Sequence, residues 1–190
     1  MFEGWVEHFP GVAVEAVDLH AGPEVGRASM SDYADAVVAP AASLPRPLTL
    51  LGWSMGGLVA LMAAERVRPR TLVVLEPSPP GEVQGFDPVV PLVEGTFDPE
   101  EVYGPFPAGI RSRPESSLAR AERKRGISVA TLPCPSLVVH GDEFPVDRGT
   151  AIASLYGSDV WHFPGLDHWG LVLDPRVPAA VAAHLDRIGY

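Results

Sequence analysis

Short apolar runs alternate along the chain with segments of helical spacing. The runs at residues 48–51, 72–75 and 137–139 are continuous, which is typical of strands that are buried on both faces of a parallel sheet. Further strands are predicted over residues 12–17 and 159–163. This alternation is the pattern of βαβ units, so the expected fold class is α/β, with a mostly parallel sheet and helices on both faces.

Helical spacing is found between most of these strands. A helix over residues 31–43 is expected to begin at Ser31, whose side chain can cap the first turn. Residues 2–9 also resemble a helix. Further helices are predicted over residues 57–66, 114–125, 146–156 and 175–188.

The stretch from residue 77 to residue 114 is rich in proline and glycine, and long regular elements are not expected there. We expect one domain over residues 1–190, with residues 78–125 inserted in it as a cap. The apolar residues of this segment could roof a mostly apolar pocket. They are Val83, Phe86, Val89, Val90, Leu92, Phe97, Tyr103, Phe106 and Ile110.

Composition excludes several classes of function. The formal net charge of −10 argues against a nucleic-acid surface, and no apolar run is long enough to span a membrane. Cys134 is the only cysteine, so no intrachain disulfide can form, and it is expected to be a small buried side chain. No signal peptide precedes the first helix, which favours the cytoplasm. No metal-ligand spacing is present, and no cofactor is implied.

The stretch Gly52-Trp53-Ser54-Met55-Gly56 matches the pattern Gly-x-Ser-x-Gly. It follows a predicted strand and opens a predicted helix, which is the context that this motif requires of a nucleophilic serine. The helix start would supply the Met55 N–H as an oxyanion donor. The alternative is a glycine-rich turn in which Ser54 only caps the helix.

A nucleophilic serine needs a positioned general base, usually histidine. His168 is the best candidate among six, because it follows the last predicted strand by a short loop near the end of the chain. His140 ends a buried strand and is expected to pack at the sheet edge. His162 within a strand and His184 on a helix are expected to be structural.

Four stretches carry a family resemblance that covers about residues 5–188. The chain resembles the α/β-hydrolase superfamily, and its serine motif is most similar to small carboxylesterases, including pimeloyl-ACP methyl ester esterases. The four stretches are Val17-Asp18-Leu19-His20, residues 51–60 around Ser54, Val138-Val139-His140-Gly141-Asp142, and Pro164-Gly165-Leu166-Asp167-His168-Trp169.

The acid of the expected triad departs from the family pattern. The resemblance places an Asp at position 144, but this chain has Phe144, which cannot accept a hydrogen bond from imidazole. Some haloalkane dehalogenases, which share the fold, carry a Glu after the strand that corresponds to residues 72–75, where this chain has Glu76. We therefore favour Glu76, then Asp142, then Asp147.

The family also has strands before the helix at residues 2–9, together with a loop that supplies a second oxyanion N–H. We therefore expect the N-terminal strands of the fold to be missing from this chain and the native reading frame to start upstream of Met1.

The sequence predicts a serine hydrolase that cleaves a small carboxylic ester or thioester with an apolar acyl part. Ser54 would be the nucleophile, His168 the base, and Glu76 or Asp142 the acid. A lactonase or perhydrolase on the same fold would use the same Ser54 and His168, while a serine at position 54 argues against a dehalogenase. A non-catalytic or truncated hydrolase-like module is the alternative from another class.

Overall fold

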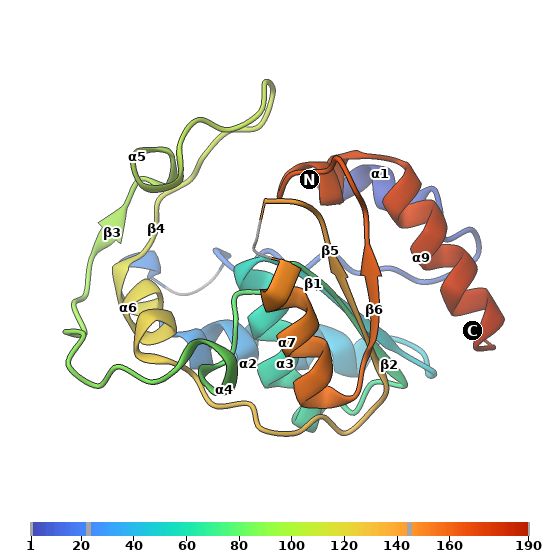
Figure 1. The fold of residues 1–190 in the computed structure, drawn as a ribbon, viewed down its shortest axis with the longest axis horizontal. Helices are drawn as coiled ribbons and strands as arrows, with labels where there is room; N and C mark the ends of the chain where they lie inside the picture. The colour runs from blue at the N-terminus through green and yellow to red at the C-terminus, as the bar shows by residue number, and fades with distance from the viewer. Residues whose placement is uncertain (1, 22–23, 144–145, 190) are drawn as a thin grey trace.

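Four parallel strands form the central sheet in the computed structural model, which describes residues 2–21, 24–143 and 146–189 (Figure 1). Their order in the sheet is β1-β2-β5-β6, so the two inner strands are β2 and β5. All residues of these inner strands are buried, as their continuous apolar runs predicted. The strands are β1 (Thr49–Trp53), β2 (Thr71–Leu75), β5 (Ser136–His140) and β6 (Asp159–His162).

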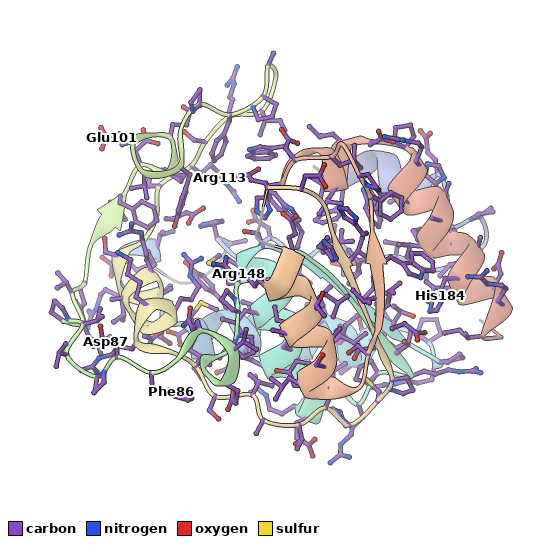
Figure 2. All side chains as sticks on the ribbon, viewed as in Figure 1. Phe86, Asp87, Glu101, Arg113, Arg148 and His184 are labelled. Carbon is purple, nitrogen blue, oxygen red and sulfur yellow. The ribbon has the colours of Figure 1, made fainter. Side chains whose placement is uncertain are left out.

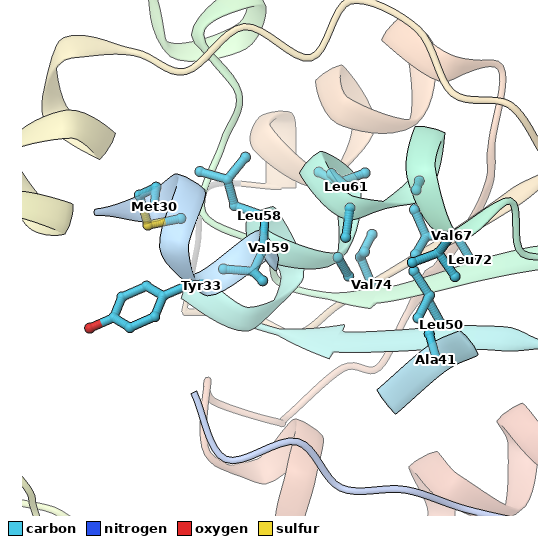
Figure 3. Close-up of a cluster of buried hydrophobic side chains, with 14 of the residues drawn as sticks. Met30, Tyr33, Ala41, Leu50, Leu58, Val59, Leu61, Val67, Leu72 and Val74 are labelled. Carbon is cyan, nitrogen blue, oxygen red and sulfur yellow. The ribbon is translucent and has the colours of Figure 1, made fainter. Parts of the chain in front are cut away.

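Side chains alternate between the two faces of this sheet and produce two hydrophobic clusters. Leu72 and Val74 of β2 pack with helices on one face, whereas Val73 and Leu75 pack with helices on the other. The first cluster, shown in Figure 3, contains side chains of α2 (Met30–Ser43), α3 (Met55–Val67) and α7 (Val146–Tyr156). The second contains side chains of α1 (Glu3–Val6), α8 (Gly170–Leu173) and α9 (Arg176–Arg187).

The helices thus cover both faces of the sheet, which confirms the predicted α/β class. In Figure 1, α9 and α1 lie on one side of the strands and α3 and α7 on the other. No helix within the described part of the chain is long and apolar enough to cross a membrane.

The segment from Ser78 to Arg125 projects away from the sheet (Figure 1). It contains only short elements, as its proline content predicted: α4 (Gly81–Gln84), β3 (Thr96–Phe97), α5 (Pro99–Tyr103), β4 (Glu115–Ser116) and α6 (Ser117–Arg125). Strands β3 and β4 pair with each other in an antiparallel ribbon. The two ends of the segment lie together, because the Gly81 N–H donates a 2.7 Å hydrogen bond to the Ile127 carbonyl.

Of two elements predicted near the start of the chain, one is wrong and the other is too long. Residues 12–17 do not form a strand, because an extended segment becomes one only where its backbone pairs with a neighbour, and no such pairing links these residues to the four-stranded sheet within the described residues. The helix predicted over residues 2–9 is reduced to Glu3–Val6, and Gly11 beyond it adopts a positive φ of 78°.

Two helix starts also differ from the prediction. Helix α2 is capped by Ser29 rather than Ser31, because Ser29 and Asp32 form a reciprocal capping box. Helix α6 begins at Ser117 rather than Pro114, since the Ser116 hydroxyl accepts a hydrogen bond from the Ala119 N–H and sets the first turn there.

Candidate functional site

Ser54 lies between the end of β1 and the first residue of α3. Its backbone is strained, with φ 55° and ψ −125°, a conformation that costs about 1–3 kcal/mol for a residue other than glycine. The Ser54 N–H donates to the Leu75 carbonyl over 3.0 Å and so extends the pairing of β1 with β2. Although Ser54 occupies the N-cap position, its hydroxyl makes no capping hydrogen bond, so the alternative of a simple helix cap is wrong.

Three glycines lie close to Ser54, and a larger residue is sterically excluded at two of them, Gly52 and Gly57. A Cβ on Gly52 would lie 2.4 Å from the Gly56 carbonyl oxygen, and one on Gly57 would lie 2.7 Å from Pro77 Cβ. A Cβ on Gly56 would meet nothing within 4 Å. The close crossing of strand and helix therefore excludes side chains at the first glycine of the motif and at Gly57.

Glu76 occupies the equivalent position after β2. Its N–H donates to the Val139 carbonyl over 2.8 Å, and its φ of 37° is again in the left-handed region. The Glu76 side chain is 1% exposed. One carboxylate oxygen, Oε1, accepts a hydrogen bond from the Gly141 N–H at 2.8 Å, and the other, Oε2, lies 2.6 Å from His168 Nδ1. Both oxygens of this buried carboxylate thus have partners.

His168 lies in the loop between β6 and α8 and is held from several sides. Besides Glu76, the Trp53 indole N–H donates to the His168 carbonyl over 3.0 Å, and the two rings lie 4.5 Å apart. The Glu143 carboxylate accepts the His168 N–H at 2.8 Å. Because Trp53 directly precedes Ser54, these contacts bring His168 to the same carboxyl edge of the sheet as Ser54 and Glu76.

Met55 is the first residue of α3, directly after Ser54. The first N–H groups of an α-helix have no partner within the helix, and they carry its positive dipole end. The backbone N–H of Met55 therefore belongs to the helix-start donors that lie beside Ser54.

Asp142, the second predicted acid, has other partners. Its carboxylate lies 2.6 Å from His162 Nε2 and accepts the Gly165 N–H at 2.7 Å. The Gly165 N–H, and after it His162, lowers the pKa of Asp142. The structure thus brings Glu76 rather than Asp142 to His168. The side chain of Asp147 and the whole of Phe144 lie outside the described residues.

The other residues that the sequence analysis singled out make contacts typical of structural side chains. His140 is buried, and it lies on the inner strand β5 rather than at the sheet edge, because β6 pairs beside it. Its ring stacks on His162 at 4.8 Å, and His184 contacts Trp161. Cys134 is half-buried, and its burial raises the pKa of the thiol. Within the described residues, no cluster of three metal-ligating side chains is present.

Sequence reasoning gave no role to Trp53 and Trp169, which connect the site to Phe106 of the projecting segment. The ring of Phe106 lies 4.7 Å from Trp169, which in turn lies 4.9 Å from Trp53. Trp53 occupies the variable position of the serine motif, so its role could have been anticipated only from its place beside Ser54. Several other apolar residues of the segment face solvent, including Phe86, Val89, Leu92 and Tyr103.

A second contact of this segment is an ion pair between Arg113 and Asp18. Both Arg113 terminal nitrogens bond the Asp18 carboxylate, at 2.6 and 2.9 Å (Figure 2 labels Arg113). The hydrogen bond from Arg113 is the largest cause of the shift that lowers the pKa of Asp18 to about 2.

The Asp18 ion pair predicts a small, pH-dependent contribution to stability. A lowered folded-state pKa stabilises the fold above the ordinary pKa of 3.8, and this contribution is lost as pH falls through about 2. Because the pair is exposed, Asp18→Asn should reduce the free energy of unfolding by less than about 1 kcal/mol at neutral pH. Urea denaturation of both proteins from neutral to acid pH should show the difference shrinking, and a difference that is constant with pH would contradict this assignment.

The geometry can be compared with known proteins. The model of a family described as "Alpha/beta hydrolase family" matches residues 4–184. The chain belongs to the alpha/beta hydrolase family. No curated protein matched the sequence.

Solved structures support the same fold for this alpha/beta hydrolase. One of the metagenome-derived lipolytic enzymes LipS and LipT is 17% identical, with a TM-score of 0.59, covering 97% of this chain and 86% of its own. The type II thioesterase BorB from the borrelidin biosynthetic cluster is 17% identical, with a TM-score of 0.54 and coverage of 83% and 71%. An esterase domain from a Rhodothermus marinus protein is 18% identical, with a TM-score of 0.54 and coverage of 87% and 70%. At these identities the likeness shows the fold alone.

Proposed function

We propose that this alpha/beta hydrolase cleaves a carboxylic ester or thioester through an acyl-enzyme, with Ser54 as nucleophile, His168 as general base and Glu76 as the acid that orients the base. The observation that carries the proposal is the buried 2.6 Å contact between Glu76 Oε2 and His168 Nδ1. A carboxylate in this place holds the proton of a neutral imidazole on Nδ1, so that Nε2 is the nitrogen that accepts a proton in the reaction.

The reaction follows from these roles. The Ser54 hydroxyl attacks the substrate carbonyl carbon while its proton passes to His168 Nε2. The oxyanion that forms is stabilised by the Met55 N–H at the start of α3. When the tetrahedral intermediate collapses, His168 gives the proton to the departing alcohol or thiol. Water then attacks the acyl-enzyme by the same route, releasing the acid and restoring Ser54.

The substrate is proposed to be a small molecule whose acyl part lies under the projecting segment, residues 78–125, which acts as a cap. The aromatic series from Phe106 through Trp169 to Trp53 supports this, because its contacting rings join the projecting segment to the residue directly before Ser54. Thioesterases and lipolytic enzymes among the solved structures of the same fold are consistent with this class of substrate.

Reaction with a fluorophosphonate probe tests the proposal directly. We expect intact-mass analysis of the purified protein to show a single adduct, and Ser54→Ala to show none. Ser128→Ala is a matched control, since Ser128 is an exposed serine bonded to Glu82 away from Ser54. An adduct that persists in Ser54→Ala, or no adduct on folded protein, would contradict the proposal, and the latter would favour a non-catalytic binding module.

Wild-type protein that forms the adduct would next be assayed on a panel of esters, thioesters and lactones, with and without peroxide. Hydrolysis of esters or thioesters alone would support the proposed class. Faster turnover of lactones, or of peroxide as the acyl acceptor, would assign a different activity to the same Ser54 and His168.

A further inference from the structure

A group of polar side chains lies where α6 of the cap meets the core, beside Ser78; Tyr33 is fully buried there, and the Arg123 side chain is 15% exposed. The Arg123 guanidinium, on α6, donates through Nη1 to the Ser78 hydroxyl at 3.3 Å. Ser78 in turn donates its N–H to the Ser54 carbonyl over 2.9 Å. Ser78 thus links the guanidinium to the backbone carbonyl of the proposed nucleophile through two hydrogen bonds.

One edge of this guanidinium has no hydrogen-bond acceptor. Among the described residues, Arg123 Nε and Nη2 are buried and make no hydrogen bond. These two nitrogens form the side of a guanidinium that presents parallel N–H groups, the geometry that binds both oxygens of one carboxylate. Glu115 is the nearest acid, but its Oε2 lies 4.0 Å from Nη2, which is too long for a hydrogen bond.

The Tyr33 hydroxyl is a second polar group in this region that has no hydrogen bond among the described residues. The Tyr33 side chain is fully buried. Figure 3 shows the Tyr33 ring at the edge of the hydrophobic cluster, with its hydroxyl pointing away from the cluster. The Met30 N–H, about one turn before Tyr33 on α2, donates to the Glu122 carboxylate at 2.6 Å, so this end of α2 contacts α6, the helix of Arg123.

Such groups are costly when they have no partner. Buried polar atoms are nearly always hydrogen-bonded in native proteins, and an unused charged donor is the most expensive case. The buried Trp5 indole follows this rule and donates to the Val172 carbonyl at 2.9 Å, whereas His20 Nε2 and Thr49 Oγ1 are two further buried atoms that make no hydrogen bond among the described residues. Burial raises the pKa of Glu115, whereas the charge of Arg123 lowers it.

We propose that Arg123, with Tyr33, binds a carboxylate at the far end of the substrate's acyl group, so that the substrate is a half-ester or half-thioester of a dicarboxylic acid. The proposal rests on the proposed function for its reaction, and it refines the expected apolar acyl part to one that ends in an anion. The substrate carboxylate bonds the Nε and Nη2 edge and accepts from the Tyr33 hydroxyl. Glu115 moves aside as this carboxylate replaces it.

A pair of substrates that differ in this one group tests the proposal. Nitrophenyl adipate half-ester and nitrophenyl hexanoate have acyl chains of the same length, and only the first ends in a carboxylate. We expect wild type to prefer the half-ester in kcat/KM by about tenfold or more. Arg123→Met should lower kcat/KM for the half-ester roughly tenfold to a hundredfold, mainly through KM, and change the hexanoate value less than about twofold.

Lys124→Met is the matched control, because it removes one positive charge from an exposed position on the same helix. It should change the two kcat/KM values equally and by less than about twofold. Equal losses on both substrates in Arg123→Met, or no preference in wild type, would overturn the carboxylate site. The hexanoate rate and the fluorophosphonate adduct report separately on the proposed serine chemistry.

Adipate binding gives a readout that does not depend on turnover. Calorimetric titration of wild type with adipate should show one site, and this site should be absent in Arg123→Met and retained in Lys124→Met. If neither ester is cleaved but adipate binds in this pattern, the anion site stands and the proposed function fails. If adipate does not bind wild type, the anion site is wrong.

Discussion

Replacing Glu76 with Ala is expected to lower kcat for ester hydrolysis by three to four orders of magnitude, about the effect of removing the acid from other serine triads. The reason is local. Glu76 is the carboxylate at 2.6 Å from His168 Nδ1, so without it the imidazole loses both its orientation and the correct tautomer. Steady-state kinetics on any hydrolysed ester measures the effect, and KM should change little.

Asp142→Ala is the control for this assignment. Asp142 bonds His162 and the Gly165 N–H, so its loss should lower kcat by less than about tenfold through the loop alone. Glu76→Gln keeps the size of the side chain and separates a chemical effect from a packing effect. If Asp142→Ala proved more damaging than Glu76→Ala in folded proteins, Glu76 would not be the acid.

Gly52→Ala should destabilise the protein by at least about 2 kcal/mol and abolish labelling of Ser54. The added methyl group would lie 2.4 Å from the Gly56 carbonyl oxygen and 2.8 Å from Gly57 Cα. Since both contacts are with backbone atoms, neither the strand nor the helix can give way without moving Ser54. Urea denaturation and fluorophosphonate labelling measure the two effects.

Gly56→Ala, at the other end of the same motif, provides the comparison. A Cβ there would meet nothing within 4 Å, and the residue is helical. Its free energy of unfolding should stay within about 1 kcal/mol of wild type. Equal destabilisation by the two substitutions would show that the crossing of β1 and α3 differs from the one described.

Local patterns were sufficient for the buried strands and for the serine turn. The runs at residues 72–75 and 137–139 are apolar throughout because both faces of the inner strands are covered, and each became a strand. The strand predicted over residues 12–17 was wrong, because an apolar run can indicate an extended chain but does not specify a pairing partner. The capping box at Ser29 was present in the sequence as Ser-x-x-Asp, two residues before the predicted cap.

Contacts between residues that are far apart in the sequence were harder to predict. Glu76 and His168 are 92 positions apart, and family resemblance rather than spacing favoured that pair. The partners of Asp142 depend on how the loop after β5 meets the loop after β6, which no local pattern encodes. Arg123 was indistinguishable from the other cations of a charged helix, because its burial depends on packing of α6 against the core.

The hydrogen bond between Gly81 and Ile127 means that the chain leaves the core and returns to it at almost one point. Ser54, Glu76 and His168 all lie outside the loop closed by this bond, and the strand pairing that positions Ser54 and Glu76 does not pass through it. Residues 82–126 can therefore be exchanged for a segment from another hydrolase without stretching the strands. Such an exchange would replace Arg123 and with it the proposed substrate selection. It would keep Glu76 and the proposed machinery for bond cleavage.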